Sequence, residues 1–349
     1  MTLMRLMSVV VPVYRNEASI PELVASLSDI AAEASVKYGC DLEAVFVVDG
    51  SPDASHDVLR GALAASGLRS QLILHSRNFG SFAAIRTGLT AGRGDCFSVI
   101  AADLQEPPEL ILDFLAALRD GGHDVAVGRR VHRSDKASSR LAASIFWRLY
   151  RRLVNREIPP GGVDVFACTR RFRDELLALR EANSSLVALI FWLGYSRVEV
   201  PYQRRPRPYG KSAWTFRRKL AYLMDSIFSF TDLPITALMW VGATGALAAA
   251  GLSVVTIFAK FVGGIDVPGY AAQILAIAFF GALNLLGMGL VGVYAWRAFE
   301  NTKGRPGALV SSSDIFPVRA GETRSWDAQE RAKDDLLTVI AEPQRVDIT

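Results

Sequence analysis

The stretch Ile100-Ala101-Ala102-Asp103-Leu104-Gln105-Glu106-Pro107-Pro108-Glu109 follows the run Phe97-Ser98-Val99-Ile100, which has the composition of a buried strand. Asp103 is therefore expected where a parallel strand gives way to a loop, the crevice in which open α/β sheets bind ligands. Pro107 and Pro108 end the loop, and a helix is expected to start at Glu109. Oxygens of Asp103 and Gln105 at such a place suit a hard cation that carries a diphosphate. An ordinary polar loop would look the same over these ten residues.

The alternation of strand, polar loop and helix recurs along the first part of the chain. Strands are expected at Met7–Tyr14, Leu42–Val48, Leu72–Leu74 and Asp124–Gly128, and helices near Pro21, over Ser55–Ala65 and over Glu109–Arg119. This pattern predicts an α/β fold, a parallel sheet with helices on both faces and ligand loops along one edge. The first loop has neither Gly-x-Gly-x-x-Gly nor a Walker sequence, which disfavours dinucleotide oxidoreductases and P-loop enzymes. A nucleotide site of carboxylate-bearing loops remains, with Asp49 placed to hydrogen-bond a base or ribose.

Two long segments without charge predict a membrane anchor. Ile235–Ala259 and Val267–Trp296 each exceed the roughly 20 residues that cross a bilayer core. Arg217, Arg218 and Lys219 precede the first segment, and Arg297, Lys303 and Arg305 follow the second. The positive-inside rule therefore predicts a two-span hairpin with both termini in the cytoplasm. Gly242, Ala246 and Ala250 form a small-residue face that favours close helix packing and contacts between copies of the chain.

Basic residues cluster although the net charge is only +4, so the chain is not a general polycation and no nucleic-acid partner is expected. An amphipathic helix is predicted over Lys136–Arg156, with Leu141, Ile145, Leu149 and Leu153 on one side and Arg148, Arg151, Arg152 and Arg156 on the other. A second one, from Phe216 to Phe228, is predicted to lie on the membrane before the first span. Three isolated cysteines in apolar contexts indicate reduced core thiols.

Two further groups complete the expected chemistry. Arg204, Arg207 and Lys211 are placed to hold an anionic head group at the bilayer surface. Asp164, in a Gly-rich setting at a strand edge, is expected to face the sugar or the nucleophile, although it could simply cap a turn. The expected organisation is a nucleotide-binding domain over residues 1–211, an amphipathic helix over 212–232, spans over 233–262 and 267–297, and a loosely ordered cytoplasmic tail over 298–349 with one helix near Trp326 to Ile340.

The order of motifs resembles glycosyltransferase family 2. The motifs are Val9-Val10-Val11-Pro12-Val13-Tyr14-Arg15-Asn16-Glu17, Asp49-Gly50-Ser51-Pro52-Asp53, Asp103-Leu104-Gln105-Glu106-Pro107-Pro108, and Gly210-Lys211-Ser212 before the hairpin. Within that family they are similar to polyprenyl-phosphate glycosyltransferases related to dolichol-phosphate mannose synthase and to bacterial enzymes that modify O-antigen and lipid A. The resemblance covers about Met7 to Trp296. It implies a GT-A fold for residues 1–211, Mg²⁺ or Mn²⁺, and a bacterial inner-membrane location.

The same resemblance implies inverting transfer of a sugar from a UDP- or GDP-linked donor to polyprenyl phosphate, and it implies a role for each candidate residue. The residues expected to bind the nucleotide sugar are Pro12, Tyr14, Asn16, Glu17, Asp49, Ser51, Asn78, Gly80, Asp103 and Gln105. Asp103 and Gln105 are expected to bind the metal, and Asp103 and Asp164 to take part in catalysis. The residues expected to bind the lipid phosphate are Arg129, Arg204, Arg207 and Lys211.

Two positions depart from the family pattern. Val48 and Ala101 stand where the family often has acidic residues, which leaves Asp103 as the principal protein ligand of the metal. Mg²⁺ sites often use one or two carboxylates with phosphate and water, so activity is still expected. The alternatives are a degenerate membrane scaffold that binds nucleotide sugar, and a glycosyltransferase with another lipid acceptor. A processive polysaccharide synthase is disfavoured because its Gln-x-x-Arg-Trp motif is missing.

Overall fold

The computed structural model describes residues 4–131, 148, 150–152, 155–159, 162–179, 181, 185–206, 216–261 and 270–317. The chain forms two compact units, a sheet unit of residues 1–180, 186–215 and 304–349 and a helical unit of residues 181–185 and 216–303. Most of the helix predicted over residues 136–156, and all of the one near residues 326–340, lie outside the described residues.

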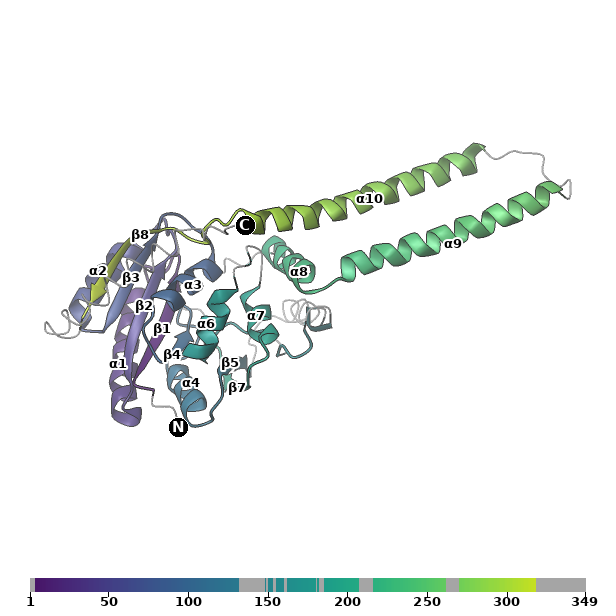
Figure 1. Cartoon of the computed structure of the whole chain (residues 1–349). Coiled ribbons are helices and arrows are strands. Elements are labelled where there is room, and N and C mark those ends of the chain that lie inside the picture. Colours follow the sequence, from purple (N-terminus) through teal and green to yellow (C-terminus); the bar gives the residue numbers. More distant parts are fainter. Residues whose placement is uncertain are drawn as a thin grey trace, which may run out of the picture. The chain divides into compact units, whose positions relative to one another are not determined.

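The sheet unit is built on one mixed sheet, which is mostly parallel (Figure 1). Its order is β7-β5-β6-β4-β1-β2-β3-β8. The strands are β1 (Leu6–Val13), β2 (Asp41–Val48), β3 (Ser70–His75), β4 (Cys96–Val99), β5 (Val125–Arg130), β6 (Phe166–Thr169), β7 (Arg197–Tyr202) and β8 (Val310–Phe316). Strands β1 to β4 run parallel to one another, because β1 pairs with β2 and β4 and β2 pairs with β3. They are buried along nearly their whole length, which explains their unbroken hydrophobic runs.

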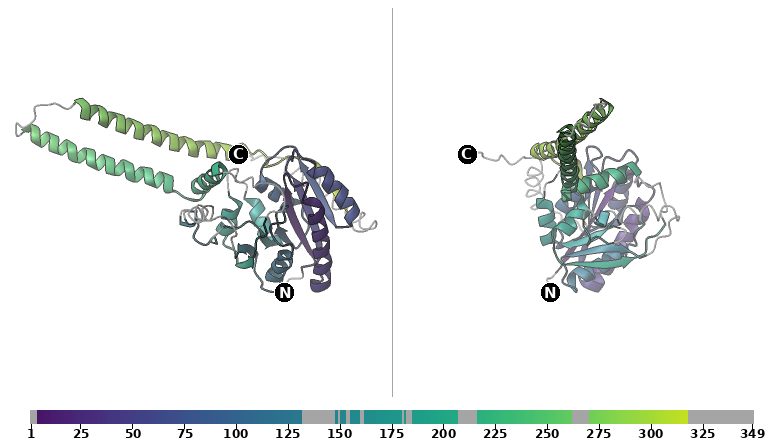
Figure 2. Two further views of the ribbon diagram at one scale, coloured as in Figure 1. Left: turned by 180° about the vertical axis from the view of Figure 1, so that it is seen from behind. Right: turned by 90° about the vertical axis from the view of Figure 1, so that its right-hand side faces the viewer.

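Helices cover both faces of this sheet (Figure 2). They are α1 (Ile20–Tyr38), α2 (Ser55–Ser66), α3 (Ser81–Ala91), α4 (Leu110–Arg119), α6 (Arg170–Ala178) and α7 (Leu186–Trp192). Helices α1 and α4 pack together on one face, and α3 packs with α6 on the other. Because β1 to β4 run parallel, their carboxyl ends place the loops after Val13, Val48, His75 and Val99 along one edge.

Two strands differ from the prediction. Strand β6 lies between β4 and β5 and is antiparallel to both. The predicted strand at Asp124–Gly128, which corresponds to β5, is therefore not the parallel neighbour of β4. Strand β6 begins at Phe166, and the loop before it is held to β5 because the Val165 carbonyl accepts the Gly128 amide hydrogen at 2.9 Å. Strand β8 corrects the prediction of a loosely ordered tail: Val310–Phe316 pair antiparallel with β3 and cover its free edge.

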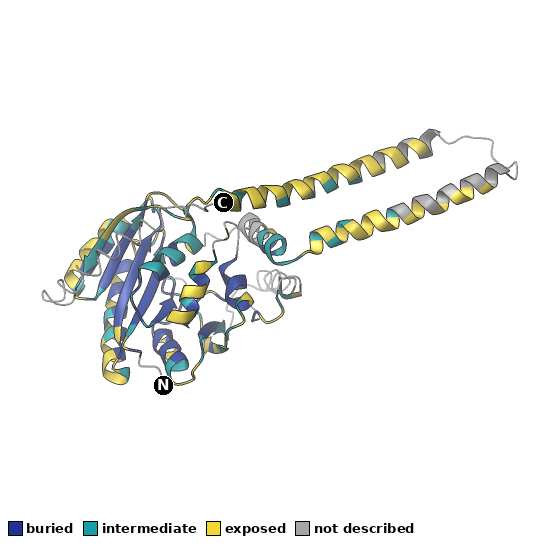
Figure 3. Cartoon of the chain, in the orientation of Figure 1, coloured by how far each residue is buried: buried dark blue, intermediate teal, exposed yellow. Residues whose placement is uncertain are grey.

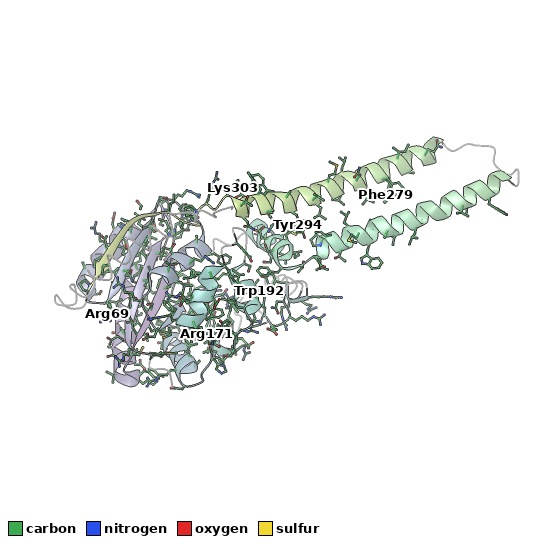
Figure 4. All side chains as sticks on the ribbon, in the orientation of Figure 1. Arg69, Arg171, Trp192, Phe279, Tyr294 and Lys303 are labelled. Carbon is green, nitrogen blue, oxygen red and sulfur yellow. The ribbon has the colours of Figure 1, made fainter. Side chains whose placement is uncertain are left out.

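The helical unit contains α8 (Phe216–Phe230), α9 (Leu233–Phe261) and α10 (Tyr270–Thr302). Within α10, Phe279–Thr302 is long and apolar enough to cross a membrane, with mean hydropathy 1.5 and none of its best window buried. A bent pair, Leu223–Phe230 with Leu233–Gly245, reaches the same threshold if taken as one span. Apolar side chains such as Phe279 lie exposed along α10 (Figures 3 and 4). Exposed apolar surface of this extent indicates membrane association.

Helix α8 is fixed to the end of α10 by polar contacts. Arg297 donates hydrogen bonds to the Asp225 carboxylate at 2.6 Å and to Ser229 Oγ at 3.1 Å. The ring of Phe228 packs against Tyr294, which is labelled in Figure 4, with ring centroids 5.6 Å apart. A helix is therefore present where the sequence predicted one before the first span, and these contacts join it to α10.

Candidate active site

Two loops at the carboxyl edge of the sheet carry unusual backbone. Among the described residues, Arg15 and Leu104 are the two non-glycine residues with positive φ, at 58° and 56°. Arg15 follows β1, and Leu104 stands between Asp103 and Gln105 after β4. Side chains other than glycine rarely adopt this conformation, and such positions concentrate at functional sites. The left-handed turn at Leu104 sets the directions of the two expected metal ligands.

Asp53 joins the loops that follow β1 and β2. Its Oδ1 accepts hydrogen bonds from Ser51 Oγ at 2.6 Å and from Ser55 Oγ at 2.7 Å, and its Oδ2 accepts the Glu17 amide hydrogen at 3.3 Å. The Ser51 hydroxyl in turn accepts the Arg15 amide hydrogen at 2.8 Å. Partial burial raises the pKa of Asp53, but these hydrogen bonds outweigh it and hold that pKa below its ordinary value.

The loop after β1 is held to its neighbours in the same way. Asn16 Oδ1 accepts the Tyr14 amide hydrogen at 3.0 Å, and the Asn16 amide donates to Ser55 Oγ at 3.1 Å. A carboxylate oxygen of Glu17 accepts the Ala54 amide hydrogen at 2.9 Å. The polar groups of Asn16, Glu17 and Ser51 thus bind backbone, while the Tyr14 ring lies exposed at the edge and Pro12 is part-buried within β1.

Asp53→Asn is expected to destabilise the protein in a pH-dependent way. A carboxyl with a depressed folded pKa contributes stability that is fully present above its unfolded pKa, about 4, and is lost as pH falls through the folded pKa. The thermal midpoint should therefore drop by several degrees at neutral pH, and the difference from wild type should close in acid. Asp57→Asn, one helical turn away with a side chain 89% exposed, is the matched control. A gap that stayed constant with pH would contradict this assignment.

Asp49 is buried and holds the loop after β3. Its Oδ1 accepts the Phe79 amide hydrogen at 2.8 Å and lies 2.9 Å from His75 Nδ1, and its Oδ2 accepts the Gly80 amide hydrogen at 2.7 Å. Asn78 Nδ2 donates to the Asp49 carbonyl at 3.2 Å. With its side chain 4% exposed, the Asp49 carboxylate positions the Asn78–Gly80 loop in this structure. The direct contact to a base or ribose expected from the sequence stays a prediction.

Gly50 lies where the loops after β2 and β3 interlock. Its φ is +54°, and a Cβ there would lie 2.3 Å from the Arg77 carbonyl carbon. We expect Gly50→Ala to lower the thermal midpoint by roughly 5–10 °C, because both the backbone conformation and the clash must be relieved. Gly67→Ala is the matched control, with φ +64° and nothing within 4 Å, and should cost about half as much or less. Equal losses in the two variants would show that close packing of the loops is unimportant.

The Asp103 loop brings its polar groups to Arg204. Asp103 is 8% exposed, and its Oδ1 accepts the Gln105 amide hydrogen at 3.2 Å. Gln105 Oε1, an expected metal ligand, accepts a hydrogen bond from Arg204 Nη2 at 2.6 Å. The backbones also pair, since the Arg205 amide donates to the Gln105 carbonyl at 2.8 Å. A cation that used Gln105 Oε1 would therefore have to displace the Arg204 guanidinium.

Two guanidinium groups share the Asp164 carboxylate. Arg130 forms an ion pair with Asp164 Oδ2, and Arg204 Nη1 lies 3.9 Å from the same oxygen. Arg204 Nε lies 3.7 Å from Glu106 Oε1, and Arg130 Nε lies 3.4 Å from the Tyr202 hydroxyl oxygen. The structure therefore joins the predicted residues Asp103, Gln105, Asp164 and Arg204 in one cluster.

Electrostatics within this cluster are strong because it is largely buried. Burial raises the pKa of Glu106, the nearby Asp103 raises it further, and Arg204 and Arg130 act against them. Burial, together with Arg204, lowers the pKa of Arg130, and burial raises that of Tyr202. Three residues of the cluster were not among the site residues predicted from the sequence: Glu106, Arg130 and Tyr202. Strand alternation could have identified Arg130, since neighbouring residues of β5 face opposite sides.

The other predicted arginines lie elsewhere or outside the described residues. Arg129 pairs with Glu199 at 2.9 Å, and both side chains are over 40% exposed. Glu199 would therefore compete with a lipid phosphate for the Arg129 side chain. Arg130, the next residue of β5, lies in the Asp164 cluster instead. Arg207 and Lys211 lie outside the described residues.

The donor set of the cluster fits an oxygen-preferring cation. Asp103 and Gln105 offer carboxylate and amide oxygens, and Glu106 has two buried oxygens without a hydrogen-bond donor within the described chain. No group of three His, Cys, Asp or Glu residues gathers among the described residues. Mg²⁺ and Mn²⁺ can bind with so few protein ligands because phosphate and water complete their coordination, whereas a zinc site would need more protein ligands.

A mostly parallel α/β sheet, with carboxylate-bearing loops at its carboxyl edge, is the architecture of the GT-A fold. The chain matches the family described as Glycosyl transferase family 2 over residues 8–179. It is 30% identical over 305 residues to an uncharacterized glycosyltransferase of Synechocystis sp., covering 87% of this chain and 94% of that protein. It is 29% identical over 306 residues to the uncharacterized glycosyltransferase YkcC of Bacillus subtilis, covering 88% and 93%. The chain belongs to glycosyltransferase family 2.

Among solved structures, the chain is similar to the mannosyltransferase PcManGT from Pyrobaculum calidifontis in complex with GDP-Man and Mn²⁺. The match has 17% sequence identity and a TM-score of 0.43, and covers 81% of this chain and 86% of that one.

Proposed function

We propose that this protein transfers a sugar, with inversion, from a nucleotide-diphosphate sugar to a polyprenyl phosphate at the cytoplasmic face of a bacterial inner membrane. The observation that carries the proposal is the pair of guanidinium groups, Arg130 and Arg204, that meet at Asp164 beside the Asp103 loop. Guanidinium groups bind phosphate oxygens in bidentate geometry, so this pair suits a phosphate acceptor.

Membrane association supports a lipid-linked acceptor. The apolar segment Phe279–Thr302 lies exposed in α10, and α9 precedes it with a similarly apolar sequence. We infer that α9 and α10 form a two-span hairpin, with basic residues on the cytoplasmic side of both ends. Contacts between copies of the chain are expected along the small-residue face of α9.

The acceptor itself needs little help from a base. A phosphate monoester has a second pKa near 6, so its attacking oxygen is already largely anionic at neutral pH. Asp164, ion-paired with Arg130, orients the two guanidinium groups toward the acceptor phosphate. Asp103 and Gln105 would hold Mg²⁺ or Mn²⁺, which stabilises the developing charge on the diphosphate leaving group when bound. Asp49 and Asn78 keep the nucleotide loop in place.

Transfer of radiolabelled sugar onto polyprenyl phosphate by the purified full-length protein tests this proposal. A panel of UDP- and GDP-linked sugars is first screened for thermal stabilisation, and each hit is assayed with Mg²⁺ or Mn²⁺ and with chelator. A lipid-extractable, metal-dependent product is expected. Product on a different lipid in the same assay, with none on polyprenyl phosphate, would identify another lipid acceptor.

The second candidate is a membrane scaffold that binds a nucleotide sugar without turning it over. It is motivated by Val48 and Ala101, where carboxylates would be expected in an active family member. Stabilisation by nucleotide sugar without product on any lipid would favour the scaffold.

A further inference from the structure

Four arginines line a hollow on the sheet unit that none of the site residues above contributes to. The hollow has a volume of about 390 Å³ and is lined by Arg148, Arg151, Arg152 and Arg156. Residues 148, 150, 151 and 152 are helical, so Arg148, Arg151 and Arg152 project from neighbouring positions of one helix face. We call this feature the arginine hollow.

Positive charge in the arginine hollow is not compensated by the described part of the chain. No described carboxylate forms an ion pair with any of its four guanidinium groups, and Arg148, Arg152 and Arg156 are exposed. Glu157, the nearest carboxylate in sequence, is instead paired with Arg197. Arg151 donates to the Arg156 carbonyl at 3.2 Å, which holds the hollow together. Four like charges around one hollow repel each other, so an anion bound there would stabilise them.

We propose that the arginine hollow binds phosphate groups of anionic phospholipids and docks the sheet unit on the bilayer surface. The chain passes between the sheet unit and the helical unit four times, at residues 180–181, 185–186, 215–216 and 303–304, so the sheet unit is tethered to any membrane in which α10 lies. The surrounding sequence also alternates arginines with Leu141, Ile145, Leu149 and Leu153, the composition of a helix that lies on a membrane.

This inference rests on the membrane association in the proposed function, but not on the acceptor or on sugar transfer. Each arginine near an anionic surface strengthens association about fivefold. Removing three of them should therefore weaken docking about a hundredfold. Arg151 is kept in the test variant because its hydrogen bond to the Arg156 carbonyl is structural.

The full-length protein, labelled with a fluorophore on an Asn155→Cys thiol, is placed in nanodiscs of phosphatidylcholine with or without roughly one-third phosphatidylglycerol. The three native cysteines are buried and should not react. Quenching by aqueous acrylamide should fall when phosphatidylglycerol is present. It should not fall in Arg148→Gln/Arg152→Gln/Arg156→Gln. It should still fall in Arg5→Gln/Arg60→Gln/Arg171→Gln, which removes the same charge at exposed positions elsewhere.

Three results would overturn the proposal. Equal quenching in both nanodiscs would show that no lipid docks, and equal loss of protection in both triple variants would show an effect of overall charge. Protection by inorganic phosphate in phosphatidylcholine nanodiscs, without any effect of phosphatidylglycerol, would assign the hollow to a soluble anion. Protection that persists in a protein without transferase activity would refute the proposed function while leaving this inference intact.

Discussion

Asp103→Ala is expected to abolish metal-dependent sugar transfer, with a loss of about 10³-fold or more in kcat/KM. The family pattern has acidic residues at positions 101 and 103. This chain keeps only Asp103, because residue 101 is alanine. Losing it would leave the leaving diphosphate without the several kcal/mol of charge stabilisation that a bound metal supplies. Leu104, with φ 56°, follows Asp103 directly, and the turn lets the Gln105 amide donate to Asp103 Oδ1 at 3.2 Å.

Ala101→Asp is the matched control for this prediction. It restores the family's second carboxylate, and it should leave the rate within a few-fold of wild type. Mn²⁺ binding, followed by electron paramagnetic resonance in the presence of nucleoside diphosphate, separates a binding defect from a chemical one. Asp103→Ala should weaken Mn²⁺ binding without shifting the thermal midpoint by more than a few degrees. Wild-type turnover in Asp103→Ala would remove this loop from the metal site.

The sheet and its loops could be predicted because the signals are local. Unbroken runs such as Val9-Val10-Val11 occur where strands are covered on both faces, and each run ends in polar residues that the fold collects at one edge. Strand β8 could not be found this way. Its Ser311-Ser312-Ser313 core is polar, and it gains strand structure only by pairing with β3 across more than two hundred residues of intervening chain.

The candidate site was predictable in its residue types but not in its pairings. Asp103, Gln105, Asp164 and Arg204 were found individually, whereas their ion pairs depend on the loop before β6 and on the end of β7 meeting the Asp103 loop. Asp49 shows the opposite case. Its place at a strand end indicated a ligand contact, but the fold surrounds its carboxylate with His75 and the Phe79 and Gly80 amides.

Arg130→Gln and Arg129→Gln form a test of this assignment on adjacent residues of one strand. Arg130 is 14% exposed and meets Asp164 and Tyr202, whereas Arg129 is 42% exposed and meets Glu199. A hydrogen bond between charged groups contributes about 1.5–3 kcal/mol when buried, so Arg130→Gln should lower kcat/KM for the lipid acceptor about 10- to 100-fold. An exposed ion pair contributes little, so Arg129→Gln should remain within about twofold of wild type.

Arg130→Lys distinguishes a phosphate contact from simple charge. Lysine keeps the positive charge but loses the planar fork, so its kcat/KM should fall between those of wild type and Arg130→Gln. The loss should appear in the kcat/KM measured for the lipid acceptor. The KM of the nucleotide sugar should change little, because the donor is held by the loops after β1 to β4. An equal loss in Arg129→Gln, or a rise confined to the donor KM, would place the acceptor phosphate away from the Arg130–Asp164 pair. Because the Arg204 guanidinium lies 3.9 Å from the Asp164 carboxylate oxygen that pairs with Arg130, we expect the loss to affect the lipid acceptor and not the donor.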